Sequence, residues 1–263
     1  MQDDPRPDTQ RWDPEMLAAH RATEAAAAAL PPVRLDRPIA PQRPINDAPA
    51  LLAAEGGPAM AETTERWVAA RGRRVLCRVH RPRTDRVLPA LVYFHGGGWV
   101  FASIDTHDRL AREYAAAAGI AVVLVDYALS PEARFPQAVE ECAEVVRWLA
   151  RSGDVWGIDG TRLLVGGDSA GGNLALAAAL LLRETGGPAL AGILVLYPVC
   201  DADFSTPSYR EFGDGRFGLS EERMRGFWGL YVREEADRLH PLASPLRARL
   251  AGLPPVLVQL AEL

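Results

Sequence analysis

The sequence is poor in cysteine and in long apolar runs, and each shortage excludes a class of protein. Its 263 residues contain three cysteines, Cys77, Cys142 and Cys200. They are odd in number, far apart and in no metal-binding spacing, so we expect small buried thiols in a reducing, cytoplasmic setting. The longest apolar runs, such as residues 25–30 and 174–182, are much shorter than the roughly 20 residues that a membrane span needs.

The sequence also lacks an excess of basic charge. Lys and Arg number 29 against 34 Asp and Glu, which gives a formal net charge of −5 and argues against nucleic acid as a partner. The acidic residues 1–5 are unlike the basic, apolar start of a signal peptide, which again favours the cytoplasm. The 23 glycines and 21 prolines follow no period, so collagen, coiled coil and wholesale disorder are excluded.

Residues 1–65 differ in pattern from residues 66–263. Residues 12–30 predict a helix, with Asp13 as its N-cap and Pro14 in its first turn. Six prolines then lie between residues 31 and 49, so this stretch is expected to hold no long regular structure. The arm could be a linker, a disordered tail or a lid over a site.

The rest of the chain alternates short apolar runs with helical patterns. Residues 66–69 and 74–80 flank Arg71-Gly72-Arg73 and predict a β-hairpin. The apolar runs lie at 90–94, 120–126, 162–165, 192–197 and 256–260, and the helical patterns at 106–118, 136–151 and 169–183. Continuous apolar strands separated by helices predict a doubly wound, mostly parallel α/β sheet.

A long insertion separates the last two strands. It holds six aromatic residues, Tyr209, Phe212, Phe217, Phe227, Trp228 and Tyr231, and Ser220 is a plausible N-cap for a helix within it. From the residues alone, these aromatics could pack on the core or could line a pocket as part of a cap.

One glycine motif lies where a predicted strand turns into a helix. Residues 167–171 read Gly-Asp-Ser-Ala-Gly, which matches a nucleophile elbow with Ser169 on a strained turn. The helix N-terminus behind such a serine favours developing negative charge. The alternative is a glycine-rich turn in which Ser169 only caps the helix.

A second glycine motif, His95-Gly96-Gly97-Gly98-Trp99, follows the strand at 90–94. Three glycines let backbone N–H groups approach a reacting carbonyl, as an oxyanion hole requires. A phosphate cradle is the alternative, but no Lys or Ser/Thr follows as in a P-loop. His95 could be a general base, and we favour instead that it orients the loop by hydrogen bonding.

Together these motifs resemble the hormone-sensitive-lipase-like branch of the α/β-hydrolases, the family IV or fold-3 esterases. Residues 126–132, Asp-Tyr-Ala-Leu-Ser-Pro-Glu, add a third block of the pattern, in which Ala128 stands where arginine is more usual. The resemblance covers roughly residues 74–263. It implies an α/β-hydrolase fold in which the arm at 1–65 and an insertion at about 203–239 form a cap.

The resemblance also implies the roles of individual residues. Ser169 would be the nucleophile, Gly97, Gly98 and the N–H of Ala170 the oxyanion hole, with His95, Gly96 and Asp168 in support. The expected reaction is hydrolysis of short to medium carboxylic esters, with no metal and no cofactor. The expected partner is a small ester substrate, and pairing with a second copy of the chain stays open.

The remaining members of a catalytic triad are not evident in the sequence. His240 is the only histidine after Ser169, and it stands before the family's acid position instead of after it. The family pattern Ala-Glu-x-Asp begins at Ala261-Glu262-Leu263, so we expect the acid and base beyond these residues and an inactive chain without them. Two alternatives stay open, an amidase or deacetylase with the same elbow and a catalytically silent acyl-ligand-binding protein.

Overall fold

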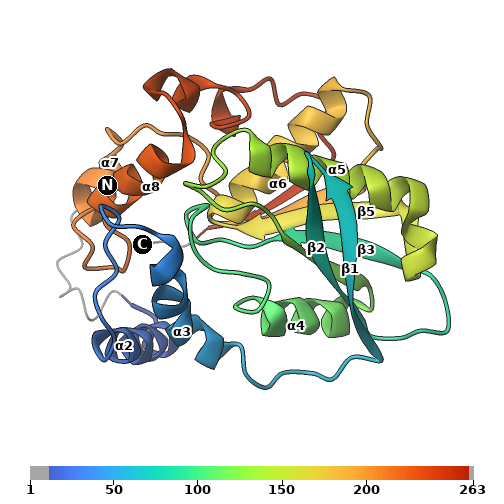
Figure 1. Ribbon diagram of the computed structural model, residues 1–263, viewed down its shortest axis with the longest axis horizontal. Coiled ribbons are helices and arrows are strands. Elements are labelled where there is room, and N and C mark those ends of the chain that lie inside the picture. The colour runs from blue at the N-terminus through green and yellow to red at the C-terminus, as the bar shows by residue number, and fades with distance from the viewer. Residues whose placement is uncertain (1–11, 261–263) are drawn as a thin grey trace.

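The computed structural model describes residues 12–260, which contain one seven-stranded sheet (Figure 1). Its strands in spatial order are β1 (Glu62–Ala70), β2 (Arg73–Arg81), β4 (Ala121–Asp126), β3 (Leu88–Phe94), β5 (Ile158–Asp168), β6 (Gly192–Leu196) and β7 (Val256–Gln259). β1 and β2 form an antiparallel hairpin, β2 also runs antiparallel to β4, and the pairs from β4 through β3, β5 and β6 to β7 are parallel. The predicted mostly parallel α/β sheet is confirmed.

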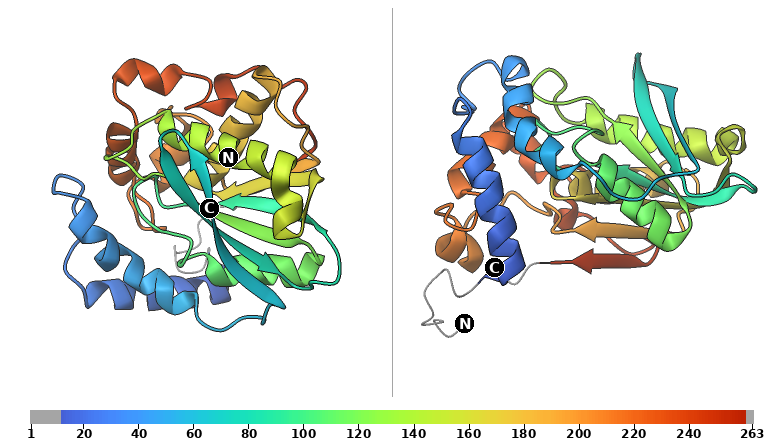
Figure 2. Two further views of the ribbon diagram at one scale, coloured as in Figure 1. Left: turned by 45° about the vertical axis from the view of Figure 1, so that its right-hand side comes forward. Right: turned by 90° about the horizontal axis from the view of Figure 1, so that it is seen from below.

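Helices cover both faces of the sheet because its central strands are apolar on both sides. Leu91 and Tyr93 of β3 pack in the smaller core beneath α4 (Asp108–Ala118), while Val92 and Phe94 point into the larger core. That larger core lies beneath α5 (Gln137–Ser152) and α6 (Ala170–Glu184), on the opposite face from α4 (Figures 1 and 2). The alternation of side chains along one strand thus divides the interior into two layers.

The N-terminal segment contains more helix than its prolines predict. α2 (Pro14–Ala28) begins as expected, with Asp13 Oδ1 accepting hydrogen bonds from the N–H groups of Glu15 and Met16. After a 3₁₀ turn, η1 (Ala40–Gln42), the chain forms α3 (Arg43–Ala53), so the expectation of no long regular structure is wrong for this part. A proline in the first turn of α3 removes no helical hydrogen bond, and Pro49 is accommodated inside the helix.

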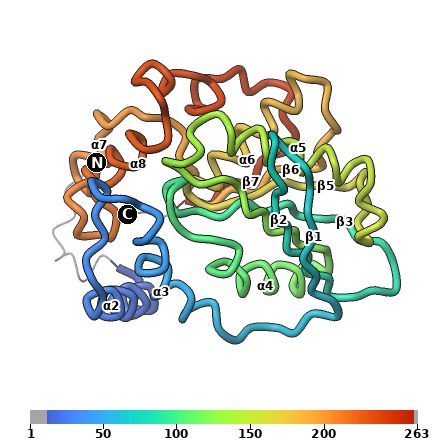
Figure 3. The backbone as a smooth tube through the Cα atoms, in the orientation of Figure 1, coloured from blue at the N-terminus to red at the C-terminus, as the bar shows by residue number. Residues whose placement is uncertain are grey.

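The insertion after β6 folds back beside the N-terminal segment (Figure 3). It contains α7 (Pro207–Phe212) and α8 (Glu221–Tyr231), and Ser220 Oγ caps α8 by accepting from the N–H of Arg223, as its sequence predicts. Three 3₁₀ turns complete the described elements: η2 (Gly153–Trp156), η3 (Glu235–Leu239) and η4 (Pro245–Arg247).

The last described strand, β7, lies at one side of the sheet and is not covered by a helix on its exposed side chains. The side chains of β7 are exposed, including Leu257 at 65%. Cys77 and Cys142 are buried as predicted, whereas Cys200 is only partly buried because it lies on the loop after β6. No helix in the described part of the chain is both long and apolar enough to cross a bilayer.

Candidate active site

Ser169 lies in a strained turn between β5 and α6. Its φ of 51° and ψ of −117° fall outside the regions that L-residues ordinarily adopt. Its backbone N–H donates to the carbonyl oxygen of Leu196 at 2.9 Å, which ties the turn to β6. The Ser169 side chain makes no capping hydrogen bond to α6, so helix capping does not account for the serine.

The glycine at position 171 is a steric requirement of this turn. A Cβ atom there would lie 1.9 Å from the carbonyl oxygen of Phe94 and 2.6 Å from that of His95. α6 can therefore begin beside the end of β3 only if position 171 lacks a side chain. Because Phe94 is paired with Gly167 across the parallel strands, the two glycine motifs meet at one edge of the sheet.

The loop after β3 turns sharply at Gly97, whose φ is 109°. The Gly97 carbonyl oxygen accepts from the N–H groups of Val100 at 3.1 Å and Phe101 at 2.9 Å. Among residues 12–260, the N–H groups of Gly97 and Gly98 donate to no protein acceptor. Orphan donors on a largely buried loop beside a serine have the character of an anion site.

Asp168 joins residues 95–102, which we name the oxyanion loop after their expected role, to the serine turn. Its Oδ1 accepts from Tyr93 Oη at 2.9 Å, from the N–H of Gly96 at 3.1 Å and from His107 Nε2 at 3.2 Å. Burial would raise the pKa of Asp168, but the His107 and Tyr93 hydrogen bonds outweigh it and hold the pKa below its ordinary value. Asp168 is therefore a buried carboxylate whose charge is held by three donors.

His95 is a buried, neutral part of the loop. Burial, together with the nearby His107, lowers its pKa to about 3. Its Nδ1 donates to the Gly96 carbonyl oxygen at 2.8 Å, and its ring stacks on Tyr127 at 4.4 Å between centroids. These contacts lie within the loop and its support, and none of them is to Ser169, which is the arrangement expected of an orienting residue.

Helix α3 holds the oxyanion loop from the other side. Arg43 Nε donates to the Val100 carbonyl oxygen at 2.9 Å, and its Nη2 donates to that of Ser130 at 3.0 Å. Asp47 Oδ1 accepts from the N–H of Ala102 at 2.9 Å. The sequence analysis missed Arg43, Asp47 and His107, because each acts across a long stretch of chain and no local pattern marks it.

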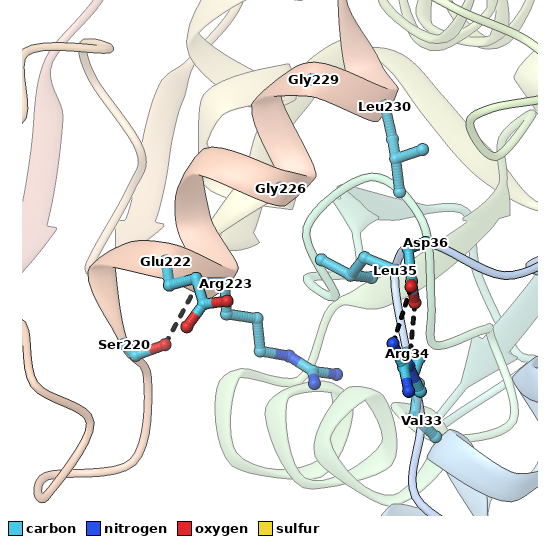
Figure 4. A pocket seen from close by; sticks show the side chains of 10 residues that line it. All are labelled: Val33, Arg34, Leu35, Asp36, Ser220, Glu222, Arg223, Gly226, Gly229 and Leu230. Atoms are coloured by element: carbon cyan, nitrogen blue, oxygen red, sulfur yellow. Dashed lines mark hydrogen bonds and ion pairs between the residues drawn. The ribbon is translucent and has the colours of Figure 1, made fainter.

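A cavity of about 720 Å³ lies between residues 33–36 of the N-terminal segment and α8 (Figure 4). Ser169 is not among the residues that line it. Phe227, Trp228 and Tyr231 do not line this cavity and are buried instead. Trp228 and Tyr231 pack against Trp99 of the oxyanion loop because these large rings are most stable out of water.

The described residues contain no histidine that hydrogen-bonds to Ser169. His240 is exposed, and its Nδ1 accepts from the N–H of Leu242 at 3.1 Å. The expected acidic motif around Glu262 lies outside the described residues. Within residues 12–260, no three His, Cys, Asp or Glu side chains are grouped so that they could hold a metal ion.

Comparison with known proteins agrees with this geometry. A family profile described as alpha/beta hydrolase fold matches residues 91–263. The chain belongs to the α/β-hydrolase family. The esterases to which it is similar belong to the hormone-sensitive-lipase-like branch of that family.

Two curated relatives are carboxylic ester hydrolases by name. Carboxylesterase NlhH of Mycobacterium tuberculosis is 39% identical over 66% of this chain and 56% of its own length. The ethyl acetate hydrolase of Pseudomonas putida is 40% identical over 70% of this chain and 59% of its own length. The chain thus spans little more than half the length of these relatives.

Solved structures extend the similarity to the N-terminal segment. The hyperthermophilic esterase of Pyrobaculum calidifontis superposes with a TM-score of 0.85 at 34% identity, covering 94% of this chain and 78% of that one. The thermostable esterase of Pseudomonas putida ECU1011 gives 0.83 at 39% identity, covering 92% and 78%. The similarity therefore includes most of the N-terminal segment as well as the sheet.

Proposed function

We propose that the protein is a carboxylesterase that acts on short to medium acyl esters through Ser169. The Ser169 oxygen attacks the ester carbonyl carbon, and the carbonyl oxygen becomes an oxyanion. The N–H groups of Gly97, Gly98 and Ala170 stabilise that oxyanion. The alcohol leaves with a proton, and water then attacks the acyl-serine to release the carboxylic acid and restore the hydroxyl.

One observation carries this proposal above the others. Ser169 occupies a strained turn at the sheet edge where Gly97 and Gly98 present N–H groups without protein acceptors. A serine that served only as a helix cap would need neither the positive φ nor the adjoining unpaired donors. The curated relatives named as carboxylesterase and ethyl acetate hydrolase add independent support.

The proposal includes a requirement for a base. A serine hydroxyl is a weak nucleophile near neutral pH unless a neighbouring group takes its proton. Since no histidine among residues 12–260 hydrogen-bonds to Ser169, we expect the 263 residues alone to be a poor catalyst. We also propose a cytoplasmic location, and a homodimer stays an open alternative to a monomer.

The test is turnover of p-nitrophenyl acetate and p-nitrophenyl butyrate by the whole protein. Ser169→Ala should lower kcat/KM by about 10³-fold or more, because it removes the nucleophile. Ser208→Ala, at an exposed serine of α7, is the matched control and should leave kcat/KM unchanged. If Ser169→Ala retains wild-type turnover, the assignment is wrong.

A further inference from the structure

Arg223 of α8 is a half-buried cation without a carboxylate partner in the described part of the chain. Its Nη2 donates to Asn46 Oδ1 at 3.0 Å, and the guanidinium carbon lies 5.3 Å from the ring centroid of Phe227 and 5.8 Å from that of Phe101. These partners are an amide and two ring faces, all of them neutral. Burial lowers the pKa of Arg223, yet an arginine keeps its positive charge in a protein.

The neighbouring charges are arranged differently. Arg225 on the same helix is paired with Glu221 at 2.7 Å, and Arg34 across the cavity is paired with Asp36 at 2.7 Å. Glu222 also lines the cavity, but it is exposed and forms no ion pair with Arg223. Of the two arginines that line the cavity, only Arg223 therefore lacks an anion within the described chain.

The Arg223 guanidinium points into the cavity between α8 and residues 33–36 (Figure 4). A half-buried cation is stabilised by an anion, and the planar guanidinium suits a carboxylate because it can donate two parallel hydrogen bonds. The flanking rings of Phe101 and Phe227 exclude water from one side, which strengthens such a pair. The cavity thus has the chemistry of a carboxylate site.

This cavity adjoins the oxyanion loop through a single ring. Phe227 follows Arg223 by one helical turn, so both side chains lie on the same face of α8. The ring of Phe227 packs directly on Gly98, where an added Cβ would lie 2.5 Å from its Cδ2. Only the side chain of Phe227 therefore separates the Arg223 cation from a molecule whose carbonyl lies at the oxyanion loop.

We propose that Arg223 is a specificity-determining residue that binds a carboxylate carried by the ester substrate. The preferred substrates are then esters with a free carboxylate at a distance from the scissile bond, and this inference rests on the proposed esterase function. The carboxylate is bound and not consumed, so the bonds formed and broken are those of ordinary ester hydrolysis. Its place on the acyl or the alcohol side is left to experiment.

The kinetic test compares charged esters with neutral isosteres in the whole protein. One pair is monoethyl glutarate and the ester in which an isopropyl group replaces its carboxylate. A second pair is the acetate ester of an ω-hydroxy acid and its matching isopropyl isostere. The first pair places the carboxylate on the acyl side and the second on the alcohol side.

Arg223→Met should lower the ratio of kcat/KM for the charged ester to that for the neutral one by about tenfold or more in at least one pair. The ratio is informative because damage to folding or to the oxyanion loop affects both esters alike. Arg225→Met, which removes an exposed charge from the same helix, should leave the ratio unchanged. Equal losses for both members of both pairs with Arg223→Met would overturn the proposal.

A binding measurement separates this inference from the esterase proposal. In a Ser169→Ala background, calorimetry with monoethyl glutarate and the hydroxy-acid acetate should show weaker binding of at least one after Arg223→Met, and not after Arg225→Met. Unchanged binding of both would overturn the carboxylate site. If the wild type cleaves no ester but binding depends on Arg223, the esterase proposal fails and the anion site stands.

Discussion

Replacing Asp168 by asparagine tests whether a buried charge joins the oxyanion loop to the serine turn. The substitution keeps the shape of the side chain and removes the charge that Tyr93, Gly96 and His107 approach with their donors. A hydrogen bond to a charged acceptor contributes about 1.5–3 kcal/mol, against about 0.5–1.5 kcal/mol for a neutral one. With three donors on one oxygen, we expect Asp168→Asn to destabilise the fold by about 3 kcal/mol.

That loss is large enough to measure directly. For a domain of this size, 1 kcal/mol corresponds to roughly 2–4 °C in Tm, so the midpoint should fall by about 6–12 °C at pH 7. The assay is thermal unfolding followed by circular dichroism, with urea unfolding as a check. Asp85→Asn is the control, because Asp85 is exposed in its ion pair with Arg83, and it should leave the midpoint unchanged.

The lowered pKa of Asp168 determines how the stability difference between wild type and Asp168→Asn should change with pH. The pKa of Asp168 is held below its ordinary value, so its stabilisation is fully present above about pH 4 and disappears as the pH falls through the lowered pKa. The difference between wild type and Asp168→Asn should therefore be constant from pH 5 to 8 and shrink only at lower pH. A variant with wild-type Tm at pH 7 would refute the reasoning.

Two further predictions concern the supports of the oxyanion loop. Burial lowers the pKa of His95 to about 3, so the unfolded state takes up its proton first and stability should fall as pH drops below about 6.5, by up to roughly 1.4 kcal/mol per pH unit. His95→Asn should flatten the urea-derived stability profile between pH 4 and 6, and parallel profiles would contradict this. Arg43→Met removes the hydrogen bonds to the carbonyl oxygens of Val100 and Ser130 and the ion pair with Glu132. It should lower kcat about tenfold with little change in KM. Arg37→Met, at an exposed position of the same segment, should change neither, and equal effects of the two variants would refute a specific role for Arg43.

The sheet and the two glycine motifs could be predicted from sequence because their causes are local. Apolar runs without alternation indicate strands buried on both faces, and the structure has them in a mostly parallel sheet. Gly171 is readable because a side chain there would overlap the carbonyl oxygen of Phe94. Because only glycine fits such a position, the steric constraint can be recognised in the sequence.

The supports of the loop could not be predicted, because their partners are distant in sequence. Arg43 reaches Val100 across 57 positions, and Asp47 reaches Ala102 across 55. Nothing in the neighbourhood of either residue distinguishes it from an ordinary surface charge, and the surrounding prolines argued against the helix that carries both. The position of that helix depends on tertiary hydrogen bonds, which the local pattern does not contain.

The roles of the aromatic residues in the insertion after β6 could be predicted only in part. Its aromatic residues are equally compatible with a packed core and with a pocket lining, and in the structure the three on α8 belong to the core. Phe227, Trp228 and Tyr231 are buried against the oxyanion loop and its surroundings, whereas Arg223 lines the cavity. Hydrophobicity identifies residues that leave water, but it does not tell which surface they cover.

The most direct test of the central claim is to trap the acyl-serine. The whole protein is mixed with excess p-nitrophenyl butyrate, quenched in acid during turnover, and digested for peptide mass spectrometry. The account predicts a butyryl group on the peptide that contains Ser169, and its absence from the same peptide of Ser169→Ala. A butyryl group on a different residue, or continued turnover with no covalent adduct, would contradict it.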